Sequence, residues 1–227
     1  MLKPKLCAVL TNTDRKSVKV VNKADLIEVR IDIIGSSWSE LSKGLKRPWI
    51  ACNRLRSEGG FWSGNEKDRI KELLRAASLG ASFIDIELNS PNIQKVVEHV
   101  KGKDSKVLIS FHDFKGTPEI EKLREIVRKQ MGLDADLCKV VVMAEKFEDN
   151  LTALKLLQEF ANRTRLISFC MGEKGSISRV LSPLFGSDFA YVSAGAGLES
   201  AGGQIELNSF RKIYEMLGSE LSSCDNL

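Results

Sequence analysis

The chain has 227 residues, of which 43% are hydrophobic and 28% charged, and its formal net charge is +4. These proportions are those of an ordinary globular protein and exclude a low-complexity or disordered chain. Lys and Arg are scattered rather than clustered, which argues against a nucleic-acid partner. No segment approaches about 18 consecutive apolar residues, so we expect no membrane partner.

Eight short apolar and β-branched runs recur along the chain and predict strands. They are residues 6–10, 26–31, 49–53, 82–88, 106–111, 137–143, 165–169 and 189–193. Amphipathic stretches of helical period lie between most of them, at residues 65–80, 118–132 and 149–163. The connections 32–48 and 170–188 are less regular, and we expect each to hold a broken helix.

This alternation continues without a linker, which predicts a single α/β domain over residues 1–227. Eight repeats favour a (β/α)₈ TIM barrel over an open doubly wound sheet, which more often has about five to seven strands. At the helix ends, Gly80 and Gly132 are predicted C-terminal caps, and Thr117 is a predicted N-terminal cap before Pro118. In a barrel, catalytic residues belong at the carboxyl ends of the strands.

Charged residues interrupt two of the predicted strands. Glu28 and Arg30 are two positions apart and therefore share one face of an extended strand. From this run alone, a structural ion pair between them is slightly favoured over a functional role. Asp85 and Glu87 repeat the pattern, and we interpret them as scaffolding that holds cations in place.

Other polar residues follow or enter the predicted strands. Arg54 and Glu58 form a charged turn before Gly59-Gly60, which permits a close-approach loop. His112 lies where an apolar strand gives way to a polar turn, a position suited to a general base, although a lone histidine is more often structural. Lys139 is embedded in an apolar strand. Burial favours the neutral form of an amine, and a neutral amine can attack a carbonyl group as a nucleophile. A lysine that extends to solvent is the commoner outcome.

The last two strands are followed by glycine-rich polar segments. The first contains Arg179, which suits a carboxylate ligand, and the second contains Ser200 and Gln204 in a loop mobile enough to act as a lid. A phosphate-binding loop is the alternative for these glycines.

Metal and disulfide chemistry have little support in the sequence. The two histidines lie far apart and no histidine or cysteine pair has metal-ligand spacing, so we expect no metal and no cofactor. Four of the five cysteines fall inside apolar, strand-like runs or directly after one, which indicates reduced core residues. With an N-terminal apolar stretch too short for a signal peptide, these features predict a cytoplasmic location.

Six motifs, in this order, resemble type I 3-dehydroquinate dehydratases over most of the chain. They are ExR at 28–30, RxxxEGG at 54–60, SFHDFxxTP at 110–118, CKVVVMA at 138–144, MGxxGxxSR at 171–179 and SAxGQ at 200–204. The resemblance implies a (β/α)₈ barrel that converts 3-dehydroquinate to 3-dehydroshikimate without a metal or cofactor. It also makes a homodimer unsurprising.

The resemblance further implies roles for individual residues. Lys139 matches the Schiff-base lysine, His112 the general acid and base, and Glu58 the carboxylate that orients the histidine. Residues that match substrate-binding positions are Glu28, Arg30, Arg54, Arg179, Ser200 and Gln204. Two positions depart from the family pattern, because Gly202 replaces a common proline and Cys170 a common serine. The proline's absence predicts a more mobile lid.

Two other functions remain open at this point. A barrel aldolase would share Lys139 but would not need His112 or the ExR motif. A noncatalytic metabolite- or phosphate-binding barrel would use Lys139 only as a structural residue.

Overall fold

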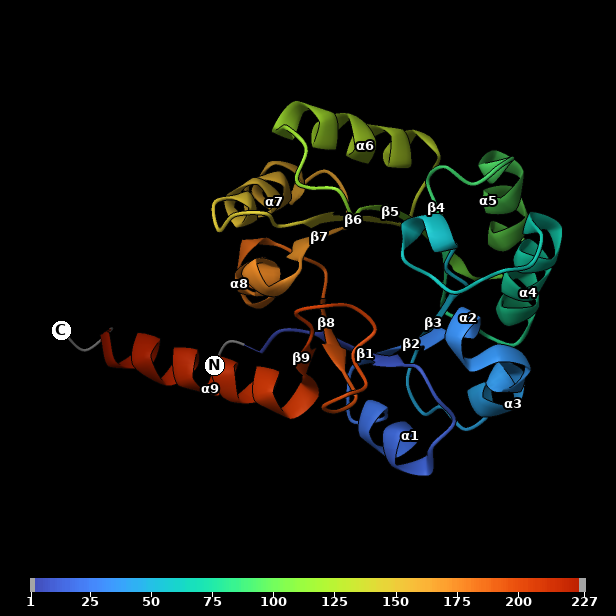
Figure 1. The fold of residues 1–227 in the computed structure, drawn as a ribbon, viewed down its shortest axis with the longest axis horizontal. Helices are drawn as coiled ribbons and strands as arrows, with labels where there is room; N and C mark the ends of the chain where they lie inside the picture. The colour runs from blue at the N-terminus through green and yellow to red at the C-terminus, as the bar shows by residue number, and fades with distance from the viewer. Residues whose placement is uncertain (1–2, 225–227) are drawn as a thin grey trace.

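The computed structural model describes residues 3–224, and the side chains of residues 3–218. Parallel strands curl around a centre, with helices on the outside (Figure 1). The strands are β1 Leu6–Leu10, β2 Leu26–Arg30, β3 Trp49–Cys52, β4 Phe83–Glu87, β5 Lys106–Asp113, β6 Leu137–Met143, β7 Leu166–Met171, β8 Ala190–Ser193 and β9 Ile205–Glu206. The predicted TIM-barrel class is confirmed, whereas the assignment of all 227 residues to one domain stays a prediction.

Helices follow most of the strands and cover the outer face of the sheet. They are α1 Arg15–Val21, α2 Ile31–Ile34, α3 Trp38–Ser42, α4 Glu66–Ser78, α5 Ile93–Lys101, α6 Ile120–Gly132, α7 Asp149–Phe160, α8 Ser176–Leu181 and α9 Leu207–Cys224. Both irregular connections hold broken helices, as expected: α2 and α3 lie after β2, and α8 lies between 3₁₀ turns after β7. None of the helices described is long and apolar enough to cross a membrane.

The helix caps match the predictions only in part. Gly80 has a φ of +87° just after α4 and is the expected C-terminal glycine. Gly132 is instead the last residue of α6, and Asp134 takes the left-handed conformation. Thr117 does not cap α6, which begins at Ile120. Its hydroxyl donates to Met143 O and so ties the loop after β5 to the end of β6.

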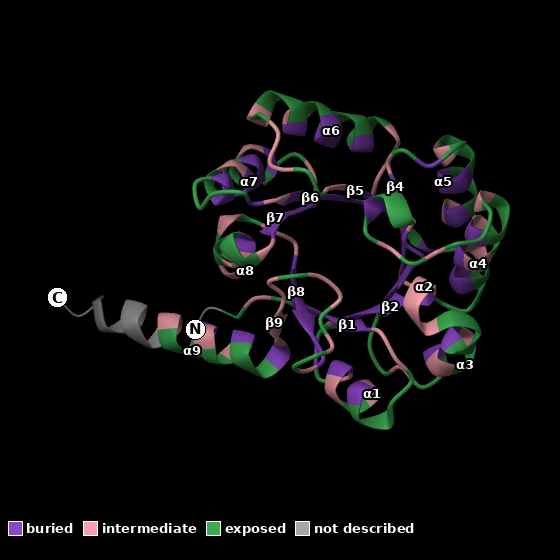
Figure 2. Ribbon diagram, in the orientation of Figure 1, coloured by how far each residue is buried: buried purple, intermediate pink, exposed green. Residues whose placement is uncertain are grey.

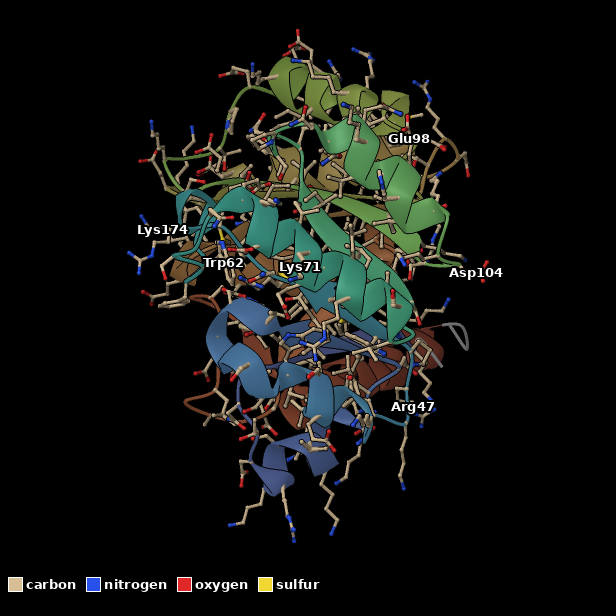
Figure 3. The ribbon with its side chains drawn as sticks, turned by 90° about the vertical axis from the view of Figure 1, so that its right-hand side faces the viewer. Arg47, Trp62, Lys71, Glu98, Asp104 and Lys174 are labelled. Carbon is tan, nitrogen blue, oxygen red and sulfur yellow. The ribbon has the colours of Figure 1, made fainter. Side chains whose placement is uncertain are left out.

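Burial follows the barrel architecture. The strands are almost entirely buried, and each helix turns its buried side toward them (Figure 2). Charged side chains labelled on the outer surface, such as Arg47, Glu98 and Lys174, project away from the body (Figure 3). One apolar cluster fills the barrel interior and includes Leu108, Val141 and Phe169. Larger clusters lie between sheet and helices. The apolar runs therefore form a core that is buried on both faces of the sheet.

The sheet order is β7-β6-β5-β4-β3-β2-β1-β8-β9, so within residues 3–224 no strand ladder joins β7 to β8. We call this junction the β7–β8 seam. At its lower end, Asp188 N donates to Leu166 O at 3.0 Å. Farther along, Cys170 N donates at 2.9 Å to Ser178 Oγ of α8 instead of to β8. The helix after β7 thus satisfies an edge amide that a complete ladder would pair.

Candidate active site

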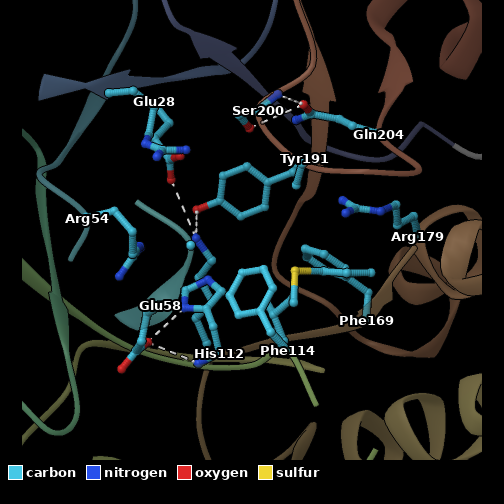
Figure 4. Close-up of a pocket in the computed structure, with 16 residues that line it drawn as sticks. Glu28, Arg54, Glu58, His112, Phe114, Phe169, Arg179, Tyr191, Ser200 and Gln204 are labelled. Atoms are coloured by element: carbon cyan, nitrogen blue, oxygen red, sulfur yellow. Dashed lines mark hydrogen bonds and ion pairs between the residues drawn. The ribbon is translucent and has the colours of Figure 1, made fainter. Parts of the chain in front are cut away.

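A pocket at the carboxyl ends of the strands brings together every residue predicted for the site (Figure 4). The predicted residues that line it are Glu28, Arg30, Arg54, Glu58, His112, Lys139, Arg179, Ser200 and Gln204. The remaining lining residues are Gly59, Phe114, Val141, Phe169, Met171, Tyr191 and Ala201. The pocket therefore combines charged groups from β2, β5 and β6 with an apolar wall from β6, β7 and β8.

Lys139 points into the barrel from β6 and is only 5% exposed. Its Nζ lies 3.3 Å from Asp85 Oδ2 and 3.5 Å from Glu28 Oε2. It also donates a 3.1 Å hydrogen bond to Tyr191 Oη. Two carboxylates offset the cost of burying a cation here, so the lysine does not need to extend to solvent. A single primary amine is thereby held at a fixed point of the pocket wall.

Glu28 and Arg30 do not pair with each other. Glu28 faces Lys139, whereas Arg30 donates to both carboxylate oxygens of Asp32 at 2.9 and 2.7 Å. The ion pair that the strand pattern favoured is therefore wrong, because Asp32 at the start of α2 offers the guanidinium a bidentate partner.

His112 lies beside Glu58 and belongs to β5 itself, which continues to Asp113, rather than to a following turn. Its Nδ1 is 3.0 Å from Glu58 Oε2, and its backbone N–H donates to the same oxygen at 3.1 Å. Burial, together with the charges of Arg54 and Lys139, holds the pKa of His112 well below 6.5. Burial raises the pKa of Glu58 from 4.5 to about 7. The imidazole is therefore neutral near pH 7 and able to accept a proton.

The loop that carries Glu58 depends on its two glycines. Glu58 ends a short 3₁₀ turn, after which Gly59 has a φ of +77°. A Cβ on Gly60 would lie 1.9 Å from Arg54 O, and one on Gly59 would lie 2.2 Å from the Phe114 ring. The predicted close-approach loop is confirmed, and it sets Glu58 against His112.

A buried network of opposite charges supports the pocket from below. Arg54 donates to Asp85 and Ser110, both at 2.6 Å, and pairs with Glu87 at 3.1 Å. Glu87 also accepts from Arg69 of α4 at 2.6 Å. Asp85 and Glu87 are therefore the scaffold that the sequence suggested. Arg69 was not predicted, because nothing in an amphipathic helix distinguishes a buried arginine from an exposed one.

Arg179 is the pocket cation whose charge has no acidic partner among the described residues. It is 4% exposed, and its guanidinium lies over the Phe169 ring at 4.4 Å. Nη2 donates to Gly202 O at 3.2 Å, while Nε has no hydrogen-bond partner. Burial lowers the pKa of Arg179 to about 10. An anion in the pocket would satisfy both the charge and the free donor.

The loop after β8 lies across the pocket and contacts the loop after β7. Ser200 donates from its backbone N–H to Gln204 Oε1 at 2.8 Å. Gly172 N donates to Gly202 O at 3.3 Å, and a Cβ on Gly203 would lie 2.4 Å from Gly172 O. These glycines thus allow two backbones to touch beside Arg179. The greater mobility expected from Gly202 stays a prediction.

One group of potential metal ligands is present in the described part of the chain, formed by Glu28, Cys52 and Asp85. Both carboxylates already face Lys139. Burial raises the pKa of the Cys52 thiol well above 9.0, so the thiol stays protonated. This cluster of three side chains is therefore better suited to bind the ammonium group of Lys139 than a metal ion.

Tyr191 is a pocket residue with a polar group that the sequence analysis missed. It lies on β8 with its side chain on the same face as Ser193, as period-two alternation requires, and it packs with Phe189 just before the strand. A phenol in an apolar run carries no charge to mark it. Its contact with Lys139 joins two strands that are not neighbours in the sheet, so local sequence contained no signal for it.

Known proteins are similar in sequence to this chain over most of its length. The profile of the family described as type I 3-dehydroquinase matches residues 7–220. A 3-dehydroquinate dehydratase from Dehalococcoides mccartyi is 37% identical over 93% of this chain and 95% of its own. One from Methanothermobacter thermautotrophicus is 41% identical over 87% of each chain.

Solved structures give the same result. The 3-dehydroquinate dehydratase from Geobacillus kaustophilus has a TM-score of 0.88 at 26% identity, covering 96% of this chain and 92% of its own. A type I enzyme from Clostridium difficile, with covalently modified comenic acid, has a TM-score of 0.84 at 26% identity, covering 95% and 92%. The chain therefore belongs to the type I 3-dehydroquinase family.

Proposed function

We propose that this chain dehydrates 3-dehydroquinate to 3-dehydroshikimate, the third step of the shikimate pathway to chorismate and aromatic amino acids, through a Schiff base on Lys139. The observation that carries the proposal is the position of this amine, buried in the same pocket as the His112–Glu58 pair. Condensation of the amine with the substrate ketone gives a protonated imine, which withdraws electrons and acidifies the neighbouring carbon. The covalently modified comenic acid in the Clostridium difficile relative is consistent with a nucleophile in such a pocket.

His112 is the proposed base for that acidified carbon. With Glu58 ionised, Nδ1–H donates to the carboxylate, and Nε2 keeps its lone pair for the substrate proton. Glu58 then stabilises the imidazolium that forms. The same imidazolium returns its proton to the departing hydroxyl, so water leaves as the enamine collapses.

Arg179 is the proposed partner of the substrate carboxylate. A buried guanidinium with an unpaired Nε and no acidic neighbour in the described residues favours an anionic ligand. Ser200 and Gln204 would close over the same end of the pocket. Glu28, Arg30 and Arg54 are proposed to hold the ring hydroxyls. Arg54 has fewer free donors for this, since both its terminal nitrogens already bind Asp85, Ser110 and Glu87.

We further propose that the enzyme works in the cytoplasm as a homodimer and needs no metal or cofactor. The imine supplies the electron sink that a cofactor supplies in other enzymes. Two-fold homo-oligomers are the commonest soluble assemblies, and sedimentation of the purified chain tests this part of the proposal.

The mechanism is tested by incubating the protein with 3-dehydroquinate and sodium borohydride, followed by intact mass measurement and peptide mapping. We expect a reduced adduct on Lys139. Turnover by folded protein without any adduct would exclude the Schiff base. Absence of both adduct and turnover would favour a binding barrel instead of an enzyme.

The raised pKa of Glu58 predicts how activity depends on pH. Below about pH 7, Glu58 is protonated, and its O–H donates to Nδ1, which leaves the proton of His112 on Nε2 and removes the base. We therefore expect kcat/KM to rise through pH 7. In Glu58→Gln, this fall of kcat/KM on the acid side of the pH profile should disappear. The maximal kcat/KM should also be lower by at least about tenfold, because a neutral amide stabilises the imidazolium less than a carboxylate does.

The measurement is kcat/KM against pH for both proteins, with borohydride trapping as a control. Because Glu58 does not touch Lys139, Glu58→Gln should still form the adduct. An unchanged acid limb in the variant would assign that limb to another group.

A further inference from the structure

Tyr191 touches the reacting nitrogen, although the mechanism described so far gives it no role. Its Oη accepts a 3.1 Å hydrogen bond from Lys139 Nζ, and Nζ lies 4.3 Å from the centre of its ring. The ring is fixed by Phe189 in an edge contact at 5.3 Å and by Phe169 at 6.2 Å. Tyr191 is 5% exposed and lines the pocket (Figure 4). The hydroxyl is therefore held at one place in the pocket, beside the amine.

Imine formation requires proton transfers that the proposed function assigns to no residue. An ammonium group and a ketone give a protonated imine and water, so two protons must move from nitrogen to the ketone oxygen. Direct transfer passes through a strained four-membered ring. A hydroxyl group that accepts one proton while donating another relieves this strain, and general acid–base assistance of this kind contributes about 10²- to 10⁴-fold.

We propose that the Tyr191 hydroxyl relays both protons from Lys139 Nζ to the substrate oxygen during Schiff-base formation, an inference that rests on the proposed function. In the first transfer, Oη takes a proton from the ammonium while the tyrosine proton passes to the ketone oxygen. The freed nitrogen lone pair forms the N–C bond, and the C=O π pair becomes the O–H bond of a carbinolamine whose nitrogen is still protonated.

The second transfer follows the same path. Oη takes another proton from nitrogen, and the tyrosine proton passes to the carbinolamine hydroxyl. The C–O bond breaks, water leaves with that electron pair, and the nitrogen lone pair forms the C=N bond. The net charge stays at one positive unit throughout, and the tyrosine is neutral after each transfer. Hydrolysis of the product imine runs the same steps in reverse.

Asp85, the carboxylate nearer to Lys139 Nζ, is less suited to this relay. Asp85 is not among the pocket-lining residues, and its oxygens are occupied by Arg54 and Ser110 at 2.6 Å. The charge of Arg54 keeps the pKa of Asp85 low despite its burial, so this carboxylate has little tendency to take a proton. Burial raises the pKa of Tyr191 well above 10.0, which keeps a hydroxyl rather than a phenolate beside the amine.

Replacement Tyr191→Phe removes the hydroxyl and keeps the ring, and the chain offers a matched control. Its other tyrosine, Tyr214, is also buried and donates its hydroxyl to Val180 O at 2.7 Å, outside the pocket. Rapid quenching with borohydride measures the rate of imine formation in a single turnover. We expect about a 10- to 100-fold slower rate in Tyr191→Phe and a wild-type rate in Tyr214→Phe.

A second measurement uses substrate deuterated at the carbon that loses its proton. In Tyr191→Phe the isotope effect on kcat should fall toward one, since imine formation then limits turnover, which a purely structural defect would not cause. Imine formation at the wild-type rate in Tyr191→Phe would overturn the relay. If Tyr191→Phe did not fold, the test would be the rate of imine formation by the wild-type protein in H₂O and in D₂O. Equal rates in the two solvents would overturn the proton relay. Failure of the wild-type protein to form any adduct would instead refute the proposed function.

Discussion

Replacement Lys139→Met is expected to abolish the borohydride adduct and to lower kcat by roughly four orders of magnitude or more, as removal of a covalent nucleophile does in other enzymes. Methionine fills a similar volume but has no amine to attack the ketone. The change also leaves Asp85 and Glu28 without the cation that they face at 3.3 and 3.5 Å. Loss of one partner from a buried ion pair costs about 3–5 kcal/mol of unfolding free energy. Thermal melting must therefore accompany the kinetics.

The control for this variant is Lys139→Arg. Arginine keeps the positive charge beside both carboxylates, but it does not deprotonate in proteins and so forms no imine. We expect Lys139→Arg to be closer in stability to the wild-type protein than Lys139→Met is, and to have as little turnover as Lys139→Met. Substantial turnover by either variant would show that the dehydration does not pass through Lys139.

Replacement His112→Ala should separate the two halves of the reaction. The Schiff base should still form, because the imidazole has no part in the contacts of Lys139 Nζ. Abstraction of the substrate proton should slow by about 10²- to 10⁴-fold. The adduct should therefore accumulate during turnover. Its mass should be that of the imine formed with 3-dehydroquinate, before the dehydration step.

The chain contains one other histidine, which provides a matched control. His99 is exposed on α5, and its Nδ1 is 2.6 Å from Lys95 O. His99→Ala should have wild-type activity. Full turnover by His112→Ala would assign proton abstraction to another pocket group.

The fold was predictable because β1 to β8 are largely apolar runs that the parallel sheet buries on both faces, whereas the two-residue, half-buried β9 was not predicted. The ends of elements were less predictable, since they depend on tertiary contacts. Thr117, for example, has the side chain of a good N-cap, but its hydroxyl binds Met143 O on the neighbouring strand. The β7–β8 seam was also not predictable from the sequence, because both strands have ordinary strand composition and the missing ladder appears only in the pairing of the folded sheet.

The site was predictable where a charged side chain broke an apolar pattern. Lys139 and His112 stood out for this reason, and the family resemblance supplied their proposed roles. What the sequence did not reveal was pairing across the barrel. Arg30 has two acidic residues close by in sequence, and only the structure shows that Asp32 is its partner. Tyr191 was missed because an aromatic residue in a strand is the usual sign of core packing.

The β7–β8 seam has a consequence for how the barrel should respond to ligands. Within the described part of the chain, one backbone hydrogen bond joins the lower ends of the two strands and one joins Gly172 to the loop that contains Ser200 and Gln204. The amide hydrogens of this junction should therefore exchange with solvent before those of the strand ladders do. A substrate carboxylate on Arg179, covered by Ser200 and Gln204, would bridge both sides of the junction. Ligand binding would then hold the two sides of the junction together. Hydrogen–deuterium exchange at the amides of Asp188 and Gly172 should therefore slow more than exchange in the strand ladders. The melting temperature should also rise with ligand concentration.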